Sequence, residues 1–154
     1  MSLTEEVALL KSIPLFAKIE PSKLKLLAFT SERLTFDPDQ ILCKQGDPGD
    51  SAYVVIDGAV RISIDAPTAP TGQIELATLG PGAIVGEIAI LCDVPRTATV
   101  TATGKTVTLR ISKELFFRLI TEFPQIAVEV MRELAHRLEK TNVQLREARV
   151  GKPH

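Results

Sequence analysis

The sequence predicts a mainly β fold of the α+β class: a double-stranded β-helix, or jelly-roll barrel, with N-terminal helices before it and a long C-terminal helix after it. Short segments with an alternation period of two follow one another between residues 32 and 111, with turn formers between them. Both ends of the chain have helical spacing instead. Because 154 residues suit one domain, we expect a single domain over 1–154, with helices in 1–31, the barrel in 32–111 and helices in 112–150.

Two helices are expected before the barrel. Leu3, Val7 and Leu10 are spaced for one apolar helix face, and glutamates stand in the first turn, where they suit the positive end of a helix. Pro14 ends this segment. Pro21 then opens a second, short helix, because proline fits the first helical turn.

The barrel strands follow from alternation and turn chemistry. Turn formers crowd residues 45–50 and 66–72, and Asp57 with Gly58 is a strong hairpin signal. Many short strands with regular turns are typical of a sandwich or jelly roll. The expected strands cover residues 33–36, 41–43, 52–56, 59–64, 74–79, 97–102 and 107–111.

Two further helices are expected after the barrel. Ser112 can cap a helix over residues 115–120, and Pro124 suits the start of a longer helix that reaches about Ala148. Apolar positions along this helix alternate between spacings of four and three, which is a heptad seam and favours a homodimer. In the alternative, the helix packs this stripe on its own barrel. The seam positions are Ala127, Met131, Leu134, Leu138, Thr141, Leu145 and Ala148.

Composition excludes several classes of function. Eighteen Lys and Arg against nineteen Asp and Glu give a net charge of -1, so no bulk attraction to nucleic acid or anionic lipid is expected. The only histidines are His136 and His154, and the two cysteines have no zinc-site spacing, so we expect neither a metal site nor a catalytic residue. We interpret Cys43 and Cys92 as buried thiols in a reducing compartment. With no membrane-spanning run and no signal peptide, the sequence predicts a cytoplasmic protein.

One segment, residues 80–100, carries a binding chemistry. Gly86 permits close backbone approach, and Glu87 opens a short expected helix that ends at Leu91. Pro95 aims Arg96 back toward the N-terminus of that helix, where free N–H groups suit an anion. Arginine binds phosphate through paired hydrogen bonds, and a carboxylate accepts from a hydroxyl. Together these groups fit a phosphorylated ribose with a free 2′-hydroxyl. A surface salt bridge between the two charges is the alternative.

The same residues resemble a known family. Residues 85–91, VGEIAIL, and 95–100, PRTATV, are similar to the phosphate-binding cassette of the cyclic-nucleotide-binding domain. That family includes the catabolite activator, the regulatory parts of cyclic-nucleotide-dependent kinases, and cyclic-nucleotide-gated channels. The likeness extends to residues 13–16, 46–50 and 53–58 and to the closing helix near 134–138.

The resemblance implies a role for each site residue. Arg96 would pair with the cyclic phosphate, Glu87 would accept from the ribose 2′-hydroxyl, and the strand 58–64 would line the pocket. Thr141 and Asn142 would read the base, although Asn142 stands where a serine is usual, as Val85 stands in place of the usual phenylalanine. The candidate site residues are Gly86, Glu87, Ile88, Ala89, Arg96, Thr97, Ala98, Val60, Ile62, Thr141 and Asn142.

From these observations we expect a non-enzymatic sensor that binds a 3′,5′-cyclic purine nucleotide, with cAMP favoured over cGMP, and needs no cofactor. We expect a homodimer through the C-terminal helix, and a downstream protein partner that the sequence does not identify. Six residues follow the predicted helix, too few for a recognition helix, so this chain should not bind DNA directly. The alternatives are the sensor half of a truncated transcription regulator, a cupin-type enzyme, and a degenerate copy that binds nothing.

Overall fold

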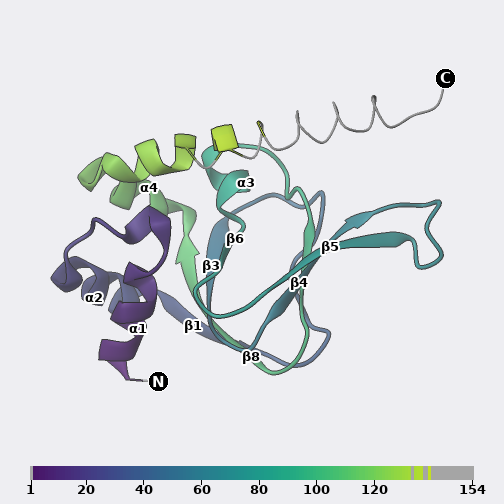
Figure 1. Cartoon of the computed structure of the whole chain (residues 1–154), viewed down its shortest axis with the longest axis horizontal. Coiled ribbons are helices and arrows are strands. Elements are labelled where there is room, and N and C mark those ends of the chain that lie inside the picture. The colour runs from purple at the N-terminus through teal and green to yellow at the C-terminus, as the bar shows by residue number, and fades with distance from the viewer. Residues whose placement is uncertain (1, 133, 137–138, 140–154) are drawn as a thin grey trace.

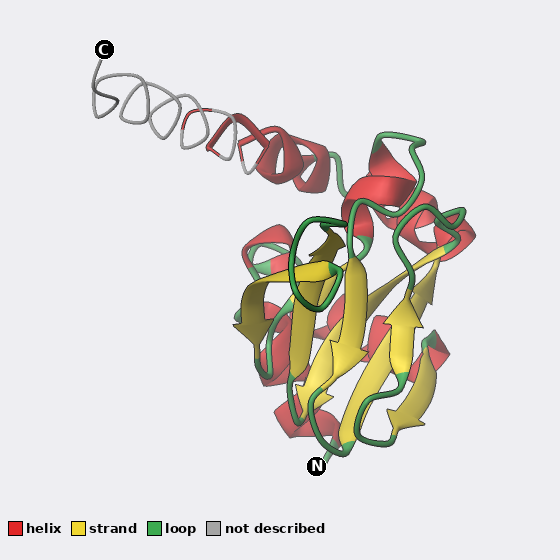
Figure 2. Ribbon diagram, turned by 90° about the vertical axis from the view of Figure 1, so that its right-hand side faces the viewer, coloured by secondary structure: helices red, strands yellow, loops and turns green. Residues whose placement is uncertain are grey.

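The described residues form two antiparallel sheets of four strands each, which confirms the predicted jelly-roll architecture. The computed structural model describes residues 2–132, 134–136 and 139. The helices gather at one side of the barrel, and the β4–β5 hairpin projects from the opposite side (Figure 1). Figure 2 shows the strands side by side, with helices behind them and above them.

The first sheet has the strand order β1-β8-β3-β6 and the second has the order β2-β7-β4-β5. The strands of the first sheet are β1 (Glu32–Phe36), β8 (Thr106–Ser112), β3 (Ser51–Asp57) and β6 (Ile84–Val85). Those of the second sheet are β2 (Ile41–Cys43), β7 (Thr99–Ala102), β4 (Val60–Asp65) and β5 (Gln73–Leu79). Only β6 was not expected among these, because two residues are too short to show an alternation.

The predicted N-terminal helices are present and pack against the first sheet. They are α1 (Leu3–Lys11), a 3-10 turn η1 (Pro14–Phe16) and α2 (Pro21–Thr30). The Ser2 hydroxyl caps α1 by accepting a hydrogen bond from the Glu5 N–H at 3.2 Å. Proline at the start of α2 lacks the N–H that would otherwise stay unpaired there.

The core falls into two clusters. The larger one lies between the first sheet and the helices and is centred on fully buried side chains such as Phe16, Leu109 and Phe116. Burial of each such side chain stabilises the fold by roughly 1.5–3 kcal/mol. The smaller cluster fills the inside of the barrel. It consists of Cys43, Tyr53, Val55, Val60, Val85 and Val100.

The closing helices begin with α4 (Lys113–Glu122). The Ser112 hydroxyl accepts a hydrogen bond from the Leu115 N–H at 3.2 Å, which confirms the predicted cap. Helical residues follow at 125–132 and 134–136. Ile126 and Val130 pack into the larger core cluster, although neither belongs to the predicted seam.

The seam itself is only partly described. Met131 has 61% of its surface exposed, whereas Leu134 packs against the larger core cluster. The first turns of the helix therefore pack on their own barrel and still present one apolar seam position outward. Leu138, Thr141, Leu145 and Ala148 lie outside the described residues.

The β4–β5 hairpin carries a β-bulge. Ile62 pairs with Ala77 and Ser63 pairs with Glu75, so Leu76 is the extra residue between them. Bulges bend a strand and change the direction of a side chain. Leu76 is 57% exposed and nevertheless lines the cavity described below. The bulge thus places an apolar side chain at the mouth of that cavity.

Candidate functional site

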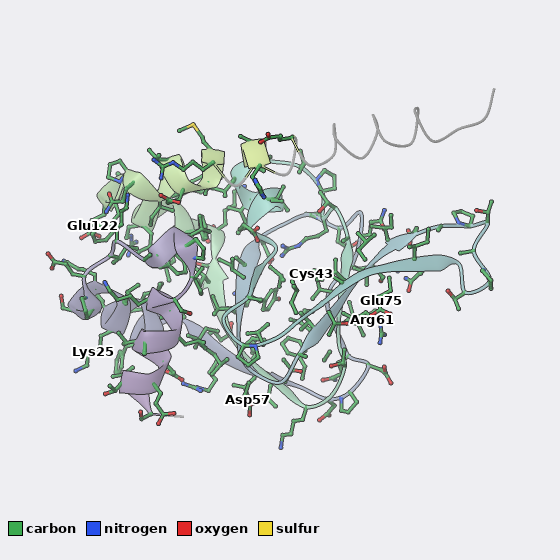
Figure 3. The ribbon with its side chains drawn as sticks, in the orientation of Figure 1. Lys25, Cys43, Asp57, Arg61, Glu75 and Glu122 are labelled. Carbon is green, nitrogen blue, oxygen red and sulfur yellow. The ribbon has the colours of Figure 1, made fainter. Side chains whose placement is uncertain are left out.

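A cavity of about 400 Å³ lies where the β4–β5 hairpin meets β6 and the segment that leads into β7. The β4–β5 hairpin contributes apolar side chains to its lining, and the predicted cassette contributes residues that include Glu87 and Arg96. Figure 3 shows Cys43, one of the lining residues, inside the barrel. The cavity is lined by Cys43, Ile62, Leu76, Leu79, Ile84, Val85, Gly86, Glu87, Ile88, Ala89, Arg96, Thr97, Ala98 and Val100.

Gly86 shapes the cassette side of the cavity. It precedes the helix α3 (Glu87–Leu91) and has a φ of 87°, a left-handed conformation that glycine adopts without cost. A Cβ atom at this position would lie 2.4 Å from the Arg96 Nη1 atom. The backbone at Gly86 therefore approaches the guanidinium group as closely as only a glycine permits.

The two charged residues singled out in the sequence both lie inside the protein. Glu87 is 4% exposed and Arg96 is 6% exposed, so a surface salt bridge between them is the wrong interpretation. Both line the cavity. Arg96 lies three residues before β7 begins at Thr99, rather than on the strand itself. Charged side chains this deeply buried require polar partners, because an isolated buried charge is costly.

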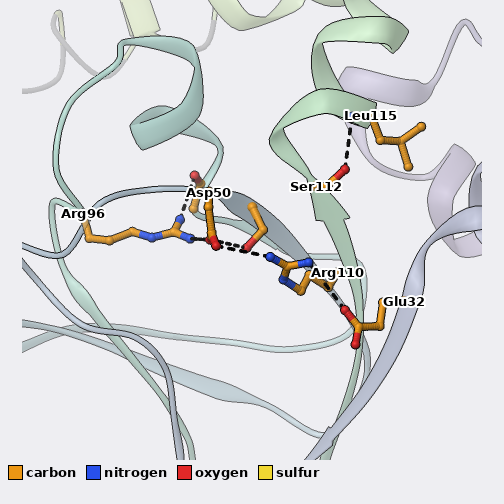
Figure 4. A network of polar contacts seen from close by, with 8 residues as sticks. Glu32, Asp50, Arg96, Arg110, Ser112 and Leu115 are labelled. Atoms are coloured by element: carbon orange, nitrogen blue, oxygen red, sulfur yellow. Dashed lines mark hydrogen bonds and ion pairs between the residues drawn. The ribbon is translucent and has the colours of Figure 1, made fainter.

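Arg96 has such partners on two sides. Its Nη1 atom donates a hydrogen bond to the Gly86 carbonyl oxygen at 3.1 Å, and its Nη2 atom lies 3.6 Å from Asp50 Oδ1. Asp50 also pairs with Arg110 at 3.3 Å, and Arg110 reaches Glu32 at 3.5 Å. Figure 4 shows this chain of alternating charges running from Arg96 through Asp50 and Arg110 to Glu32.

The Asp50 carboxyl group is held in its charged form. Burial alone would raise its pKa, but a hydrogen bond from the Ser51 hydroxyl at 3.0 Å and the two neighbouring guanidinium groups outweigh burial. The pKa of Asp50 therefore lies below its ordinary value of 3.8. At neutral pH this residue presents a full negative charge to the guanidinium group of Arg96.

The loop after β2 braces the backbone of Arg96. The Gly46 N–H donates to the Arg96 carbonyl oxygen at 2.9 Å, and the Arg96 N–H donates to the Asp47 carbonyl oxygen at 2.8 Å. Gly49 lies so close to the cassette that a Cβ atom there would meet the Cβ of Ala89 at 2.5 Å. The turn formers at 45–50 thus belong to the site, and not merely to a surface turn.

The two cysteines differ, which corrects the expectation that both are buried. Cys43 is buried, whereas Cys92, at the end of α3, is exposed. Burial raises the pKa of the Cys43 thiol from its ordinary 9.0 to about 11, although the positive charge of Arg96 opposes the rise. Cys43 therefore faces the cavity as a neutral thiol at physiological pH.

Eight of the predicted site residues lie together around the cavity: Gly86, Glu87, Ile88, Ala89, Arg96, Thr97, Ala98 and Ile62. Val60 does not line it. This residue shares the inward face of β4 with Ile62 but is fully buried in the smaller core cluster. Thr141 and Asn142 lie outside the described residues.

Sequence reasoning predicted Ile62 in the apolar lining but missed Leu76, Leu79 and the acidic partner of Arg96. Leu76 reaches the cavity through the bulge, and no local pattern marks a bulge in this hairpin. Asp50 contacts Arg96 from a distance of 46 positions in the chain. The only available signal was the cluster of turn formers in which Asp50 stands.

Within residues 2–132, 134–136 and 139, no group of three or more His, Cys, Asp or Glu side chains could hold a metal ion. Over the same residues no helix combines the length and apolarity needed to cross a bilayer.

Comparison with known proteins places this site in context. The chain is 30% identical over 129 residues to a CRP-like cAMP-activated global transcriptional regulator of Mycobacterium tuberculosis, a match that covers 83% of this chain and 56% of that protein. It is 31% identical over 123 residues to a cAMP-dependent protein kinase regulatory subunit of Dictyostelium discoideum, covering 79% of this chain and 36% of that one. The chain thus spans about half or less of these relatives.

The fold is similar to the crystal structure of Thermus thermophilus catabolite activator protein, with a TM-score of 0.77 and 30% identity over 86% of this chain and 61% of that one. Residues 33–123 match the cyclic nucleotide-binding domain family. That stretch holds nearly all of the barrel, the cavity, and the buried pair Glu87 and Arg96. The chain therefore belongs to the cyclic nucleotide-binding domain family.

Proposed function

We propose that this domain binds a 3′,5′-cyclic purine nucleotide, and cAMP in preference to cGMP, as a regulatory module that performs no chemistry on its ligand. The observation that carries the proposal is the buried guanidinium group of Arg96 in a cavity that apolar side chains of the β4–β5 hairpin also line. A cyclic nucleotide has the same division, with an anionic phosphate at one end and a flat base at the other.

Each part of the ligand has a matching part of the cavity. The cyclic phosphate pairs with Arg96, because charge-assisted hydrogen bonds from guanidinium groups are strong and fit phosphate oxygens. Glu87 accepts the hydrogen bond of the ribose 2′-hydroxyl. The base lies against the apolar side chains of Ile62, Leu76 and Leu79 in the hairpin.

The preference for cAMP rests on the base. The amino group of adenine donates hydrogen bonds and requires an acceptor such as the hydroxyl of Thr141 or the amide oxygen of Asn142. The two relatives compared above carry cAMP in their names, which supports the same choice. Thr97 also lines the cavity, and a threonine at this position would equally suit guanine, so the choice between the two bases rests on Thr141 and Asn142.

Signalling through a homodimer is the second half of the proposal. Met131, one position of the predicted seam, is exposed. The base-reading candidates Thr141 and Asn142 belong to the same predicted helix. A ligand that contacts this helix can change its packing only by as much as its affinity differs between the two arrangements. Leu138→Glu should give monomers in sedimentation and weaker nucleotide binding. A variant with unchanged mass and affinity would contradict the dimer.

We place the domain itself in the cytoplasm. The response to ligand binding is carried out by another protein or by another domain. The alternative, the sensor half of a transcription regulator, is favoured by one observation: the chain spans 56% of a related transcriptional regulator. The length of the natural reading frame distinguishes these possibilities. The downstream partner is not defined by any residue of the cavity.

Calorimetric titration with cAMP, cGMP and a cyclic dinucleotide tests the proposed ligand directly. We expect binding of both mononucleotides, tighter for cAMP, and no binding of the dinucleotide, which carries a second phosphate and a second base. Tighter binding of cGMP would overturn the base preference alone. Absence of heat with both mononucleotides would overturn the proposed function.

A further inference from the structure

The phosphate side of the cavity belongs to the segment before β7, and the base side belongs to the β4–β5 hairpin. These two segments are not paired with each other at the cavity. β4 pairs with β7 only as far as Ser63, which stands opposite Thr99. Residues 96–98 of the cassette lie before this pairing begins and line the cavity, whereas β4 continues into the projecting hairpin, which contributes apolar lining residues. The width of the cavity therefore depends on what holds these two segments together.

The end of this pairing leaves a backbone donor on β4 without a strand partner. The Ala66 N–H donates to the Gly72 carbonyl oxygen at 2.8 Å, so the N–H of the preceding residue, Asp65, points away from β5 and toward the β7 side. β7 does not extend far enough to meet it, because the strand begins at Thr99. An exposed donor at this point would let water loosen the hairpin.

The side chain of Gln45 takes the place of the missing strand. Its Oε1 atom accepts the Asp65 N–H at 2.7 Å, across 20 positions in the chain. The backbone N–H of Gln45 donates to the Thr99 hydroxyl at 3.0 Å. The next residue, Gly46, donates to the Arg96 carbonyl oxygen at 2.9 Å. Gln45 and the adjacent Gly46 thus join the hairpin to the backbone that carries the phosphate-binding arginine.

We infer that Gln45 is a positioning residue that fixes the distance between the phosphate side and the base side of the cavity. It does not itself line the cavity, so it acts through the hairpin on one side and through Arg96 on the other. The inference rests on the proposed function for its effect on nucleotide affinity. The link between Gln45 and the hairpin is independent of any ligand.

The chain offers a closely matched control. Gln40 also places its Oε1 atom 2.7 Å from a backbone N–H, that of Asp37, but it does so within a tight turn between β1 and β2, away from the cavity. Gln45→Leu and Gln40→Leu therefore each remove one hydrogen bond of the same kind and length. An effect seen in both variants reports the loss of a hydrogen bond in general, whereas an effect seen only in Gln45→Leu reports the loss of the link to the hairpin.

Hydrogen exchange of the ligand-free protein, followed by NMR, tests the link. In Gln45→Leu we expect the Asp65 amide and the hairpin amides to exchange about fivefold faster, which corresponds to the net value of one hydrogen bond. In Gln40→Leu only the amide of Asp37 should change. Unchanged hairpin exchange in Gln45→Leu would overturn the inference, whatever the protein binds.

Calorimetry and dissociation rates with cAMP test the consequence. We expect Gln45→Leu to bind about fivefold more weakly through a faster dissociation rate, and Gln40→Leu to stay within about twofold of the wild type. Equal thermal midpoints of the two variants would show matched stability. If the hairpin loosens but both variants bind equally well, Gln45 does not position the cavity. If the wild type binds no cyclic nucleotide, the proposed function fails while the exchange result still decides the link.

Discussion

The buried guanidinium of Arg96 faces the carboxylate of Asp50, with Nη2 and Oδ1 3.6 Å apart. Asp50 is mostly exposed and fully charged at neutral pH, so its carboxylate partly balances the positive charge of Arg96 when no anion is bound. A phosphate entering the cavity meets an arginine that is already oriented by Gly86 and partly neutralised by Asp50.

Asp50→Asn should strengthen nucleotide binding. The amide keeps an oxygen that can accept from Arg96, while the competing negative charge is removed. Because exposed ion pairs are worth only about 0–1 kcal/mol, we expect a gain of about two- to fivefold at low ionic strength that vanishes at high salt. Calorimetry at two salt concentrations measures it. Weaker binding would mean that the charge of Asp50 orients Arg96 more than it competes with the ligand.

Gly86→Ala should abolish binding as well as destabilise the fold. A side chain at a φ of 87° costs about 1–3 kcal/mol, and its Cβ would collide with Arg96 Nη1. Gly72→Ala is the control, since Gly72 has a φ of 77° with no atom within 4 Å of the added Cβ. Thermal unfolding should show a loss in both variants. Titration should show lost affinity only in Gly86→Ala; equal affinities would remove Gly86 from the site.

The thiol of Cys43 should be slow to alkylate. Its pKa of about 11 leaves little thiolate at pH 8, whereas the exposed Cys92 is open to reagent. Mass spectrometry after brief iodoacetamide treatment should find label on Cys92 first. Bound cAMP should slow the labelling of Cys43 further, because that residue lines the cavity. Rapid labelling of Cys43 in the folded protein would contradict its burial.

The raised pKa of the Cys43 thiol also predicts that the free energy of unfolding falls at alkaline pH. The folded pKa of about 11 lies above the ordinary 9.0, so the unfolded state releases its proton first as the pH rises. The contribution of Cys43 is therefore complete below about pH 9 and is lost as the pH rises toward 11, by at most about 2–3 kcal/mol. Denaturant titrations of the wild type and Cys43→Ala should differ in their pH slope over this interval, and parallel slopes would refute the shift.

Glu87→Gln should weaken the preference for a ribose ligand. A carboxylate accepts from the 2′-hydroxyl, and a site built for a hydroxyl rejects a ligand without one. The amide oxygen of glutamine can still accept from the hydroxyl but without the negative charge, so we expect about tenfold weaker binding of cAMP and a smaller preference for cAMP over its 2′-deoxy analogue. Glu75→Gln, on the exposed face of the hairpin, is the control. Undiminished discrimination in Glu87→Gln would assign the 2′-hydroxyl to another residue.

The strands and the cassette could be predicted because their signals are local. Alternation marks β4 and β8, and the Gly86–Glu87 pair and Arg96 lie within one short segment. The folded cassette confirms the predicted start of the short helix at Glu87. Local spacing was therefore sufficient for the cassette side of the cavity.

The remaining parts of the site depend on contacts between distant segments. Asp50 and Gln45 reach the arginine and the hairpin from a loop that looks like an ordinary turn in the sequence. Val60 and Ile62 have the same alternation, but only the barrel shape decides that one is core and the other lines the cavity. Burial of Cys43 and exposure of Cys92 are likewise set by packing rather than by residue type.

The most direct test is calorimetric titration of cAMP into the wild type, Arg96→Ala and Arg61→Ala. Arg61 is the control because it pairs with Asp39 at 3.9 Å and does not line the cavity, so both variants lose one positive charge. Truncating a buried charge partner costs about 2–5 kcal/mol, so Arg96→Ala should bind at least about thirtyfold more weakly, whereas Arg61→Ala should stay within about twofold. Wild-type affinity in Arg96→Ala would contradict the assignment of this cavity as the cyclic nucleotide site.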